Sequence, residues 1–370
     1  MSAQQVFKAT SIVLLTVLCA YIVVTSLRIL VILLIAVIIA SAVRPLVVRL
    51  GKWRVPQGVA IGVIYLGIAS FIIAVAVALL PPIVNQFTNY VENDSRLATR
   101  IIIAQLWVER SISDFTNNDV SLVDSEQIRS AVSEFAAQVR QTMPNLVDDL
   151  GNTIADSVLI FVMGAYWLTS YKSATEYLTQ LSPPRYRDNV YKMIDEIELT
   201  MGSYVRGVVT IASIVGILNF IPMQLLGVPN ALTLSFIIAI TTTIPMIGGF
   251  IGGITTVFLT LITNTEYVFI VFAIFFIVQQ IENYLLSPRI MSHHVHLDPI
   301  LVIVYTSIGF VMGGITGALI VVPIMGTVHI LLKYLVIEPY KERMQSVKME
   351  NGEMVIEPVN STKSPNMEGN

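Results

Sequence analysis

The residues best suited to chemistry form a short polar cluster at the end of a long apolar stretch. Gln279, Gln280, Glu282 and Asn283 follow an uninterrupted apolar run. On a helix, residues three and four positions apart share one face, so this spacing brings Gln279, Glu282 and Asn283 together. A carboxylate within an apolar helix is costly, and Glu282 is therefore a candidate partner for a proton, a cation or a polar solute. Arg289 lies close beyond the cluster and is also a candidate binding residue. The structural alternative is an ion pair between Glu282 and Arg289.

Two further polar features interrupt apolar sequence upstream of this cluster. Asn219 is an isolated carboxamide in an earlier apolar run, and Thr241, Thr242 and Thr243 directly precede the helix breaker at Pro245. These groups could bind a polar solute. Threonine hydroxyls at a helix break also often satisfy only the freed backbone, and that alternative stays open.

Other kinds of site find little support. The glycines at 248–253 lack the Lys-Ser/Thr ending of a phosphate-binding loop, so we do not expect ATP-driven transport by this chain alone. His293, His294 and His296 cluster, but a structural or interfacial role is favoured over metal binding or proton sensing. The single cysteine, Cys19, excludes a disulfide framework. We therefore predict no enzymatic activity, no cofactor and no metal.

Composition indicates a membrane protein. Of the 370 residues, 55% are hydrophobic and only 13% are charged, whereas soluble domains carry about 25% charged residues. The net charge of −3 argues against a nucleic-acid partner, which would call for a basic surface. The expected environment is the lipid bilayer.

Several apolar segments approach the roughly 20 residues that a membrane span requires. The predicted full spans cover residues 9–27, 29–43, 58–80, 151–171, 207–227 and 268–288. The third is expected to stop at Pro81-Pro82. Orientation follows from the turn after the second span, which carries Arg44, Arg49, Lys52 and Arg54 without an acid, and is therefore predicted to be cytoplasmic. Both termini are then cytoplasmic, and residues 82–150 lie outside.

The C-terminal half contains an internal repeat, because Gly-Gly-Ile-Thr occurs at 252–255 and again at 313–316. Each unit is a span followed by an overlong apolar stretch, 231–263 and 299–332. A straight helix of that length would measure about 50 Å, against about 30 Å of hydrocarbon. Both stretches contain helix breakers, which we predict to be hinges: Pro245, Gly248, Gly249, Gly252, Gly253, Gly313 and Gly314.

Two topologies are compatible with these lengths. Re-entrant hairpins would make the second unit inverted relative to the first, whereas full crossings would give eight spans and parallel repeats. We favour about six full spans plus two re-entrant helical hairpins, an arrangement typical of secondary transporters. The predicted organisation is a three-span scaffold (1–81), an extracytoplasmic helical insert (82–150), a fourth span with a cytoplasmic amphipathic helix (151–206), a transport core of two units (207–265 and 266–335) and a cytoplasmic, partly disordered tail (336–370).

The motifs IPMIGGFIGG, ENYLLSPRIMSHHVHLDP and GFVMGGITGALIVVPI resemble the autoinducer-2 exporter family of bacterial membrane proteins. The matching positions are Glu282, Asn283, Pro288, Arg289, Ile290, Met291, Val295, Leu297, Pro299, the Gly-Gly pairs and Pro323. Ser292 and Asp298 depart from the commoner Gly and His, so no ligand role is carried to Asp298. The resemblance covers roughly residues 10–335, with specific motifs confined to 240–325.

This resemblance implies a multi-pass transporter of the bacterial inner membrane that forms a homo-oligomer, such as a pentamer, with elevator-like movement. Some members are described as exporting autoinducer-2, and others look like sodium(lithium)/proton antiporters. The sequence hypothesis is thus an all-α transporter of a small polar solute that works by alternating access, with Glu282 as proton or cation partner. The alternatives are antiport of a monovalent cation against protons and a scaffold without transport activity.

Overall fold

The computed structural model describes residues 25–91, 124–291, 299–339, 347–350 and 353–356, with isolated residues between 7 and 21 and between 98 and 114. It confirms the prediction of an all-α, multi-pass membrane protein. Large apolar side chains face outward, as lipid contact requires; Val311 and Met312 are 85% and 83% exposed. Within the described residues, six helices are long and apolar enough to cross a membrane: Leu27–Lys52, Gln57–Ala78, Ile154–Gln180, Pro184–Leu225, Thr265–Ile290 and Ile300–Ile337.

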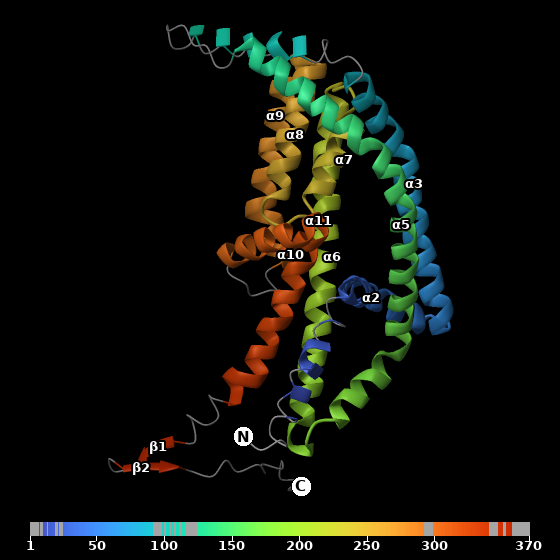
Figure 1. Cartoon of the computed structure of the whole chain (residues 1–370), viewed down its shortest axis with the longest axis vertical. Coiled ribbons are helices and arrows are strands. Elements are labelled where there is room, and N and C mark those ends of the chain that lie inside the picture. The colour runs from blue at the N-terminus through green and yellow to red at the C-terminus, as the bar shows by residue number, and fades with distance from the viewer. Residues whose placement is uncertain are drawn as a thin grey trace, which may run out of the picture.

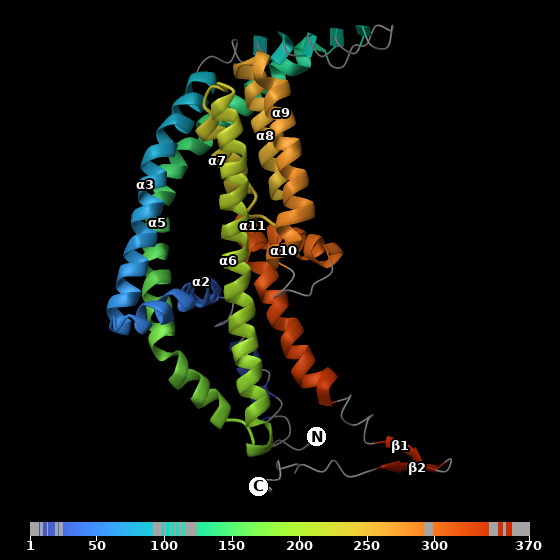
Figure 2. The same ribbon diagram turned by 180° about the vertical axis from the view of Figure 1, so that it is seen from behind.

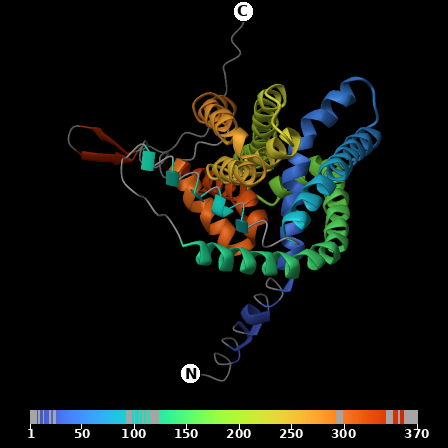
Figure 3. The same ribbon diagram turned by 90° about the horizontal axis from the view of Figure 1, so that it is seen from above.

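The N-terminal helices form one packed body. It consists of α2 (Leu27–Lys52), α3 (Gln57–Val91) and α5 (Ser125–Gln180). Helix α2 is nearly end-on in Figure 1 and lengthwise in Figure 3, so it lies across the long axis that α3 and α5 follow. The Gln57 carboxamide on α3 donates to the Leu168 carbonyl on α5 at 2.9 Å. The three helices share a buried apolar cluster of Ala40, Val43, Val47, Ala60, Ile61, Tyr65 and Leu168.

Several predicted boundaries fall inside continuous helices. The boundary expected at 150–151, between the helical insert and the fourth span, lies inside α5, which has 56 residues. The boundary expected at 206–207 lies inside α6 (Arg187–Leu225), which follows a short turn of 3-10 helix at Pro184–Tyr186. The helix that contains the third span does not end at Pro81-Pro82, because α3 continues to Val91. The part of it that is long and apolar enough to cross a membrane is Gln57–Ala78. Each proline frees only one carbonyl, which a helix can tolerate.

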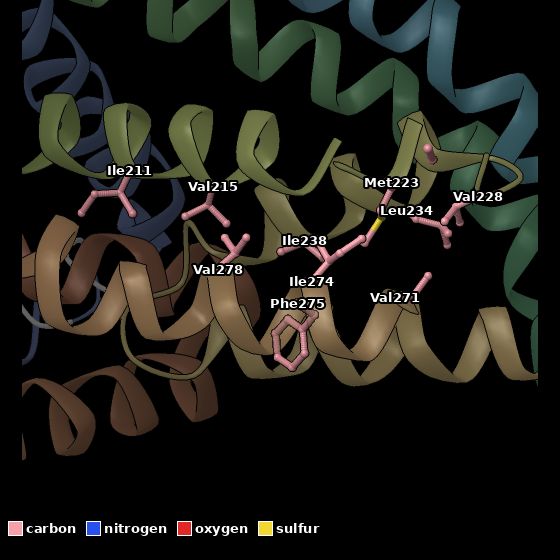
Figure 4. Close-up of a cluster of buried hydrophobic side chains, with 11 residues drawn as sticks. Ile211, Val215, Met223, Val228, Leu234, Ile238, Val271, Ile274, Phe275 and Val278 are labelled. Carbon is pink, nitrogen blue, oxygen red and sulfur yellow. The ribbon is translucent and has the colours of Figure 1, made fainter. Parts of the chain in front are cut away.

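The second body packs α6 against α7 (Ala231–Thr241), α8 (Gly248–Thr263) and α9 (Val268–Ile281). Figures 1 and 2 show α7, α8 and α9 running side by side along the part of α6 nearest its C-terminal end. On α6, the cluster residues Ile211, Val215 and Met223 occupy one face at multiples of four residues. Figure 4 shows this core, which comprises Ile211, Val215, Met223, Val228, Ala231, Leu234, Ile238, Val271, Ile274, Phe275 and Val278.

Beyond α9 the chain forms a π-helical turn at Glu282–Leu286, the short α10 (Ser287–Met291) and α11 (Pro299–Leu332). A second π-helical turn, Lys333–Ile337, extends α11. The strands β1 (Val347–Glu350) and β2 (Glu353–Ile356) pair antiparallel, with Val347 opposite Ile356. The histidine cluster, part of the predicted first span, much of the insert between 92 and 123 and the last fourteen residues fall outside the described residues.

Helix α11 is long enough to cross a membrane, yet it reverses direction. The backbone leaves helical geometry at Gly313 and Gly314. The backbones of Gly309 and Gly317 then pack against each other, and Val321 also lies beside Gly309. Residues eight apart in a straight helix would be about 12 Å apart. The stretch 299–332 is therefore a helical hairpin that turns at the second Gly-Gly pair.

Candidate functional site

The first overlong stretch is also a helical hairpin, and its turn lies at residues 242–247, between α7 and α8. Pro245 has no N–H to continue a helix, and Met246 takes a left-handed φ of 66°. The turn is held by backbone hydrogen bonds from the Ile244 N–H to the Thr241 carbonyl and from the Gly248 N–H to the Ile244 carbonyl, at 2.9 and 3.0 Å. With 11 residues, α7 measures only about 16 Å.

One pair of glycines lets α8 approach α7. A Cβ at Gly248 would collide with the carbonyl of Thr241, and a Cβ at Gly252 would collide with the Thr241 side chain and the Ile238 backbone. The two glycines are four residues apart and face the same neighbour. They form a small-xxx-small contact of the kind that lets membrane helices approach closely.

The adjacent pair of glycines lets α8 approach α9. A Cβ at Gly249 would meet the carboxamide of Gln279, and one at Gly253 would overlap the ring of Phe275. The predicted hinge residues Gly252 and Gly253 thus lie inside α8 as packing positions. The second Gly-Gly-Ile-Thr motif contains the turn of its own hairpin, at Gly313-Gly314, whereas the first motif lies within α8. The two motifs are therefore not structurally equivalent.

This packing places Gln279 against the hairpin tip, next to the other members of the predicted cluster. The Gln279 Nε2 donates to Glu282 Oε2 at 3.1 Å and to Asn283 Oδ1 at 3.4 Å. Gln279 is 6% exposed, Glu282 is half-buried and Asn283 is exposed. The three side chains form a polar path that leads from the hairpin tip toward the surface.

The backbone at Glu282 is itself unusual, because Glu282–Leu286 forms a π-helical turn directly after α9. Such turns often occur at functional sites. Gln280, on the neighbouring position of α9, is half-buried. Arg289 is exposed, and within the described residues it forms no ion pair with Glu282. The carboxylate therefore has its carboxamide neighbours rather than the cation that sequence offered as an alternative.

The remaining predicted site residues divide into two groups. Thr241 and Thr243 donate to carbonyls of their own helix at 2.6–3.0 Å, so both satisfy local backbone. Asn219 is fully buried on the α6 face that forms the core; its Nδ2 donates to the Val215 carbonyl at 2.9 Å. Within the described part of the chain, Asn219 Oδ1 and Thr242 Oγ1 are buried and lack partners.

Sequence reasoning missed a second polar cluster, which joins the two bodies. Arg44 on α2 pairs with the buried carboxylate of Glu198 on α6. The same guanidinium lies 3.8 Å from the ring centroid of Tyr171 on α5. Two residues before Glu198 on α6, Glu196 pairs at 2.9 Å with Lys333, which lies in the turn that follows α11. From sequence, Arg44 indicates only the orientation of the chain, because a partner 154 residues away leaves no local sequence signal.

Pro45 explains a further contact between the two bodies, in which Arg206 on α6 binds the backbone of α2. Pro45 lies inside α2 and cannot donate to the carbonyl four residues before it, that of Ser41. Arg206 on α6 donates to the carbonyls of Ser41 and Ala42 at 3.2 and 3.3 Å. The two helices cross closely here, because a Cβ at Gly202 would overlap the Ser41 carbonyl.

Comparison with known proteins gives a consistent result. A family model described as AI-2E family transporter matches residues 11–337. YueF of Bacillus subtilis is 24% identical over 293 residues, which cover 76% of this chain and 78% of that protein. YrrI of the same organism is 22% identical, covering 68% and 71%, and MT0215 of Mycobacterium tuberculosis is 23% identical, covering 70% and 67%.

The names of all three relatives refer to transport, and none of these names gives a substrate. The family match spans most of the chain, including both helical hairpins and the polar cluster beside the first of them. The chain therefore belongs to the AI-2E transporter family.

Proposed function

We propose that the chain is a secondary transporter that moves a small polar solute, with autoinducer-2 as the candidate, across the bacterial inner membrane by alternating access. The observation that carries the proposal is the contact between Gln279 and the backbone of Gly249. It joins a polar path, formed with Glu282 and Asn283, to the tip of a helical hairpin. Movement of that tip would change the surroundings of all three polar side chains.

The form of the hairpin supports this proposal. Broken helices at membrane depth are tolerated where protein or a wet cavity covers them, and transporters bind their substrates at such breaks. The helix α7 has only about half the length of a membrane crossing. We further propose that both hairpins are re-entrant, that the two units are inverted repeats, and that the chain forms a homo-oligomer, such as a pentamer, with cytoplasmic termini.

The cluster is chemically suited to a polyhydroxylated solute. Gln279 and Asn283 offer donors and acceptors, and Glu282 offers a charged acceptor. The buried Asn219 Oδ1 and Thr242 Oγ1 add acceptors within the same body. In our proposal the solute bonds the carboxamides near the hairpin tip, and Glu282 binds the proton or cation that drives transport.

A second candidate is antiport of sodium or lithium against protons. Glu282 favours it, because this half-buried carboxylate lies within a span whose other charged residues, Glu266 and Arg289, are near its ends, and it has no ion pair with Arg289. One carboxylate can suffice for exchange of a cation against a proton. In that case the carboxamides of Gln279 and Asn283 would complete the oxygen ligands of the cation.

Transport by the purified full-length protein in proteoliposomes tests these proposals. Glu282→Gln should lower solute flux by about tenfold or more, because the neutral side chain cannot bind the proton or cation that drives transport. Glu266→Gln is the matched control, since it removes an exposed carboxylate at the other end of the same span.

The assay also separates the two candidates. Flux of autoinducer-2 without cation-driven changes in internal pH supports solute transport. Cation-driven pH changes without solute flux, abolished by Glu282→Gln, support antiport. Wild-type rates of both processes in the Glu282→Gln protein would exclude Glu282 from coupling and remove the basis of the proposed site.

A further inference from the structure

A pocket of about 370 Å³ lies between α2 and α6, away from the hairpin tip. Its volume falls within the range of about 300–1,000 Å³ that is usual for small-molecule sites. Ten residues line it, six from α2 and four from α6: Ser41, Arg44, Pro45, Val48, Arg49, Lys52, Asp195, Glu198, Leu199 and Arg206. Four of these side chains are basic and two are acidic, so the lining has an excess of positive charge.

Two of the basic side chains already have partners. Arg44 neutralises the buried Glu198, and Arg206 donates to the α2 backbone at 3.2 and 3.3 Å. Arg49 and Lys52 are exposed, and no hydrogen bond or ion pair is formed by either within the described residues. They are three residues apart on α2 and therefore share a face. Of the two acids, Glu198 is neutralised by Arg44, and Asp195 accepts a hydrogen bond from the Tyr171 hydroxyl at 3.4 Å. Four basic and two acidic side chains leave a net charge of about +2, and Arg49 and Lys52 are its two free cations.

The same pocket has an apolar side. Val48 and Leu199 line it, and each is 53% exposed. Free cations next to exposed apolar side chains match an amphiphile whose anionic group and hydrocarbon are adjacent. A freely soluble anion would gain nothing from Val48 and Leu199. The combination favours a phospholipid, and basic pockets between membrane helices are known to hold anionic headgroups.

We propose that this pocket binds the phosphate group of an anionic phospholipid. Arg49 and Lys52 contact the phosphate, and an acyl chain lies along Val48 and Leu199. Because α2 belongs to the N-terminal body and α6 to the second body, the bound lipid contacts both. This assignment does not depend on the transported solute, since it uses none of the residues at the hairpin tip.

The experiment uses the purified full-length protein and measures retained lipid by native mass spectrometry, with thermal stability as a second readout. The probes are phosphatidylglycerol, phosphatidylcholine and inorganic phosphate. The double variant Arg49→Gln/Lys52→Gln should bind phosphatidylglycerol about twentyfold more weakly, because two charges near the phosphate are lost. The pocket variant should also lose the rise in melting temperature that this lipid produces in the wild type.

The matched control is Arg54→Gln/Arg185→Gln, which removes the same charge from two positions that do not line the pocket. The control should retain phosphatidylglycerol like the wild type. Equal losses in the two double variants would overturn the site, because general attraction to the membrane would then explain binding. Stabilisation by inorganic phosphate alone, lost in the pocket variant, would overturn the lipid assignment in favour of a soluble phosphate.

Discussion

Pro45 deprives the Ser41 carbonyl of its helical donor, and Arg206 on α6 supplies a replacement from outside the helix. A buried acceptor without a donor costs about 1–3 kcal/mol, so this contact stabilises the crossing of α2 and α6. The proline therefore fixes a tertiary contact at a point where its local effect is only to weaken a helix. Neither residue has this role without the other.

This pairing predicts a measurable coupling. Arg206→Met should destabilise the protein by about 1–3 kcal/mol, because the freed carbonyl loses its donor. In a Pro45→Ala background the N–H of residue 45 can bond the Ser41 carbonyl, so the same substitution should cost about 1 kcal/mol less. Thermal unfolding of the four proteins in detergent micelles measures the difference. Equal losses in the two backgrounds would show that Arg206 acts independently of the proline.

At the scale of elements, glycine has two different roles in the two hairpins. In the first, four glycines in two overlapping small-xxx-small pairs bring α8 close to α7 and α9, and the chain turns elsewhere, at Pro245. In the second, the Gly-Gly pair is the turn itself, and Gly309 and Gly317 pack the two arms. Identical four-residue motifs thus have different structural roles in the two units.

The second turn predicts a contrast between adjacent residues. Gly314 has φ 59° and ψ −144°, a combination that only glycine adopts readily, whereas Gly313 has φ −144°. No atom lies within 4 Å of a Cβ at either position, so sterics with neighbours do not differ. Gly314→Ala should cost about 1–3 kcal/mol, and Gly313→Ala should be nearly neutral.

Melting temperatures of the two alanine variants, measured on purified protein in the same detergent, test this contrast. A large loss in both would mean that the turn needs flexibility at each glycine. No loss in either would mean that the arms of α11 hold the turn whatever its backbone preference.

Sequence alone predicted the elements better than their relations. Spacing and hydrophobicity were sufficient to place Gln279, Glu282 and Asn283 on one face, because that face depends only on local helix geometry. The breaks at Pro245 and Gly313 could also be predicted from the sequence. The packing role of Gly253 could not be predicted, because the Phe275 ring that requires a glycine at this position belongs to another helix. The Arg44–Glu198 pair had no local pattern for the same reason.

At the scale of the molecule, the two buried apolar clusters share no residue. The contacts between α2 and α6 include an ion pair and hydrogen bonds to backbone, and a charged pocket lies beside them. Such an interface is more polar than either core. Movement of one body against the other would therefore break the Arg44–Glu198 ion pair and the hydrogen bonds from Arg206, while both apolar cores would stay intact.

The arrangement of the helices predicts which turns share a side of the membrane. Pro184–Leu225 has 42 residues, about 60 Å, and therefore spans about 30 Å of hydrocarbon with residues to spare. With α7 only about 16 Å long, we expect the α7–α8 hairpin to return to the side from which it came. In a Cys19→Ser background, cysteines at Leu226 and Glu266 should react with an impermeant maleimide from one side of the membrane. A cysteine at Arg185 should react only from the other side. Reaction of the Leu226 and Glu266 positions from opposite sides would mean that residues 231–263 cross the membrane once, and the re-entrant hairpin and the inverted repeat would both be wrong.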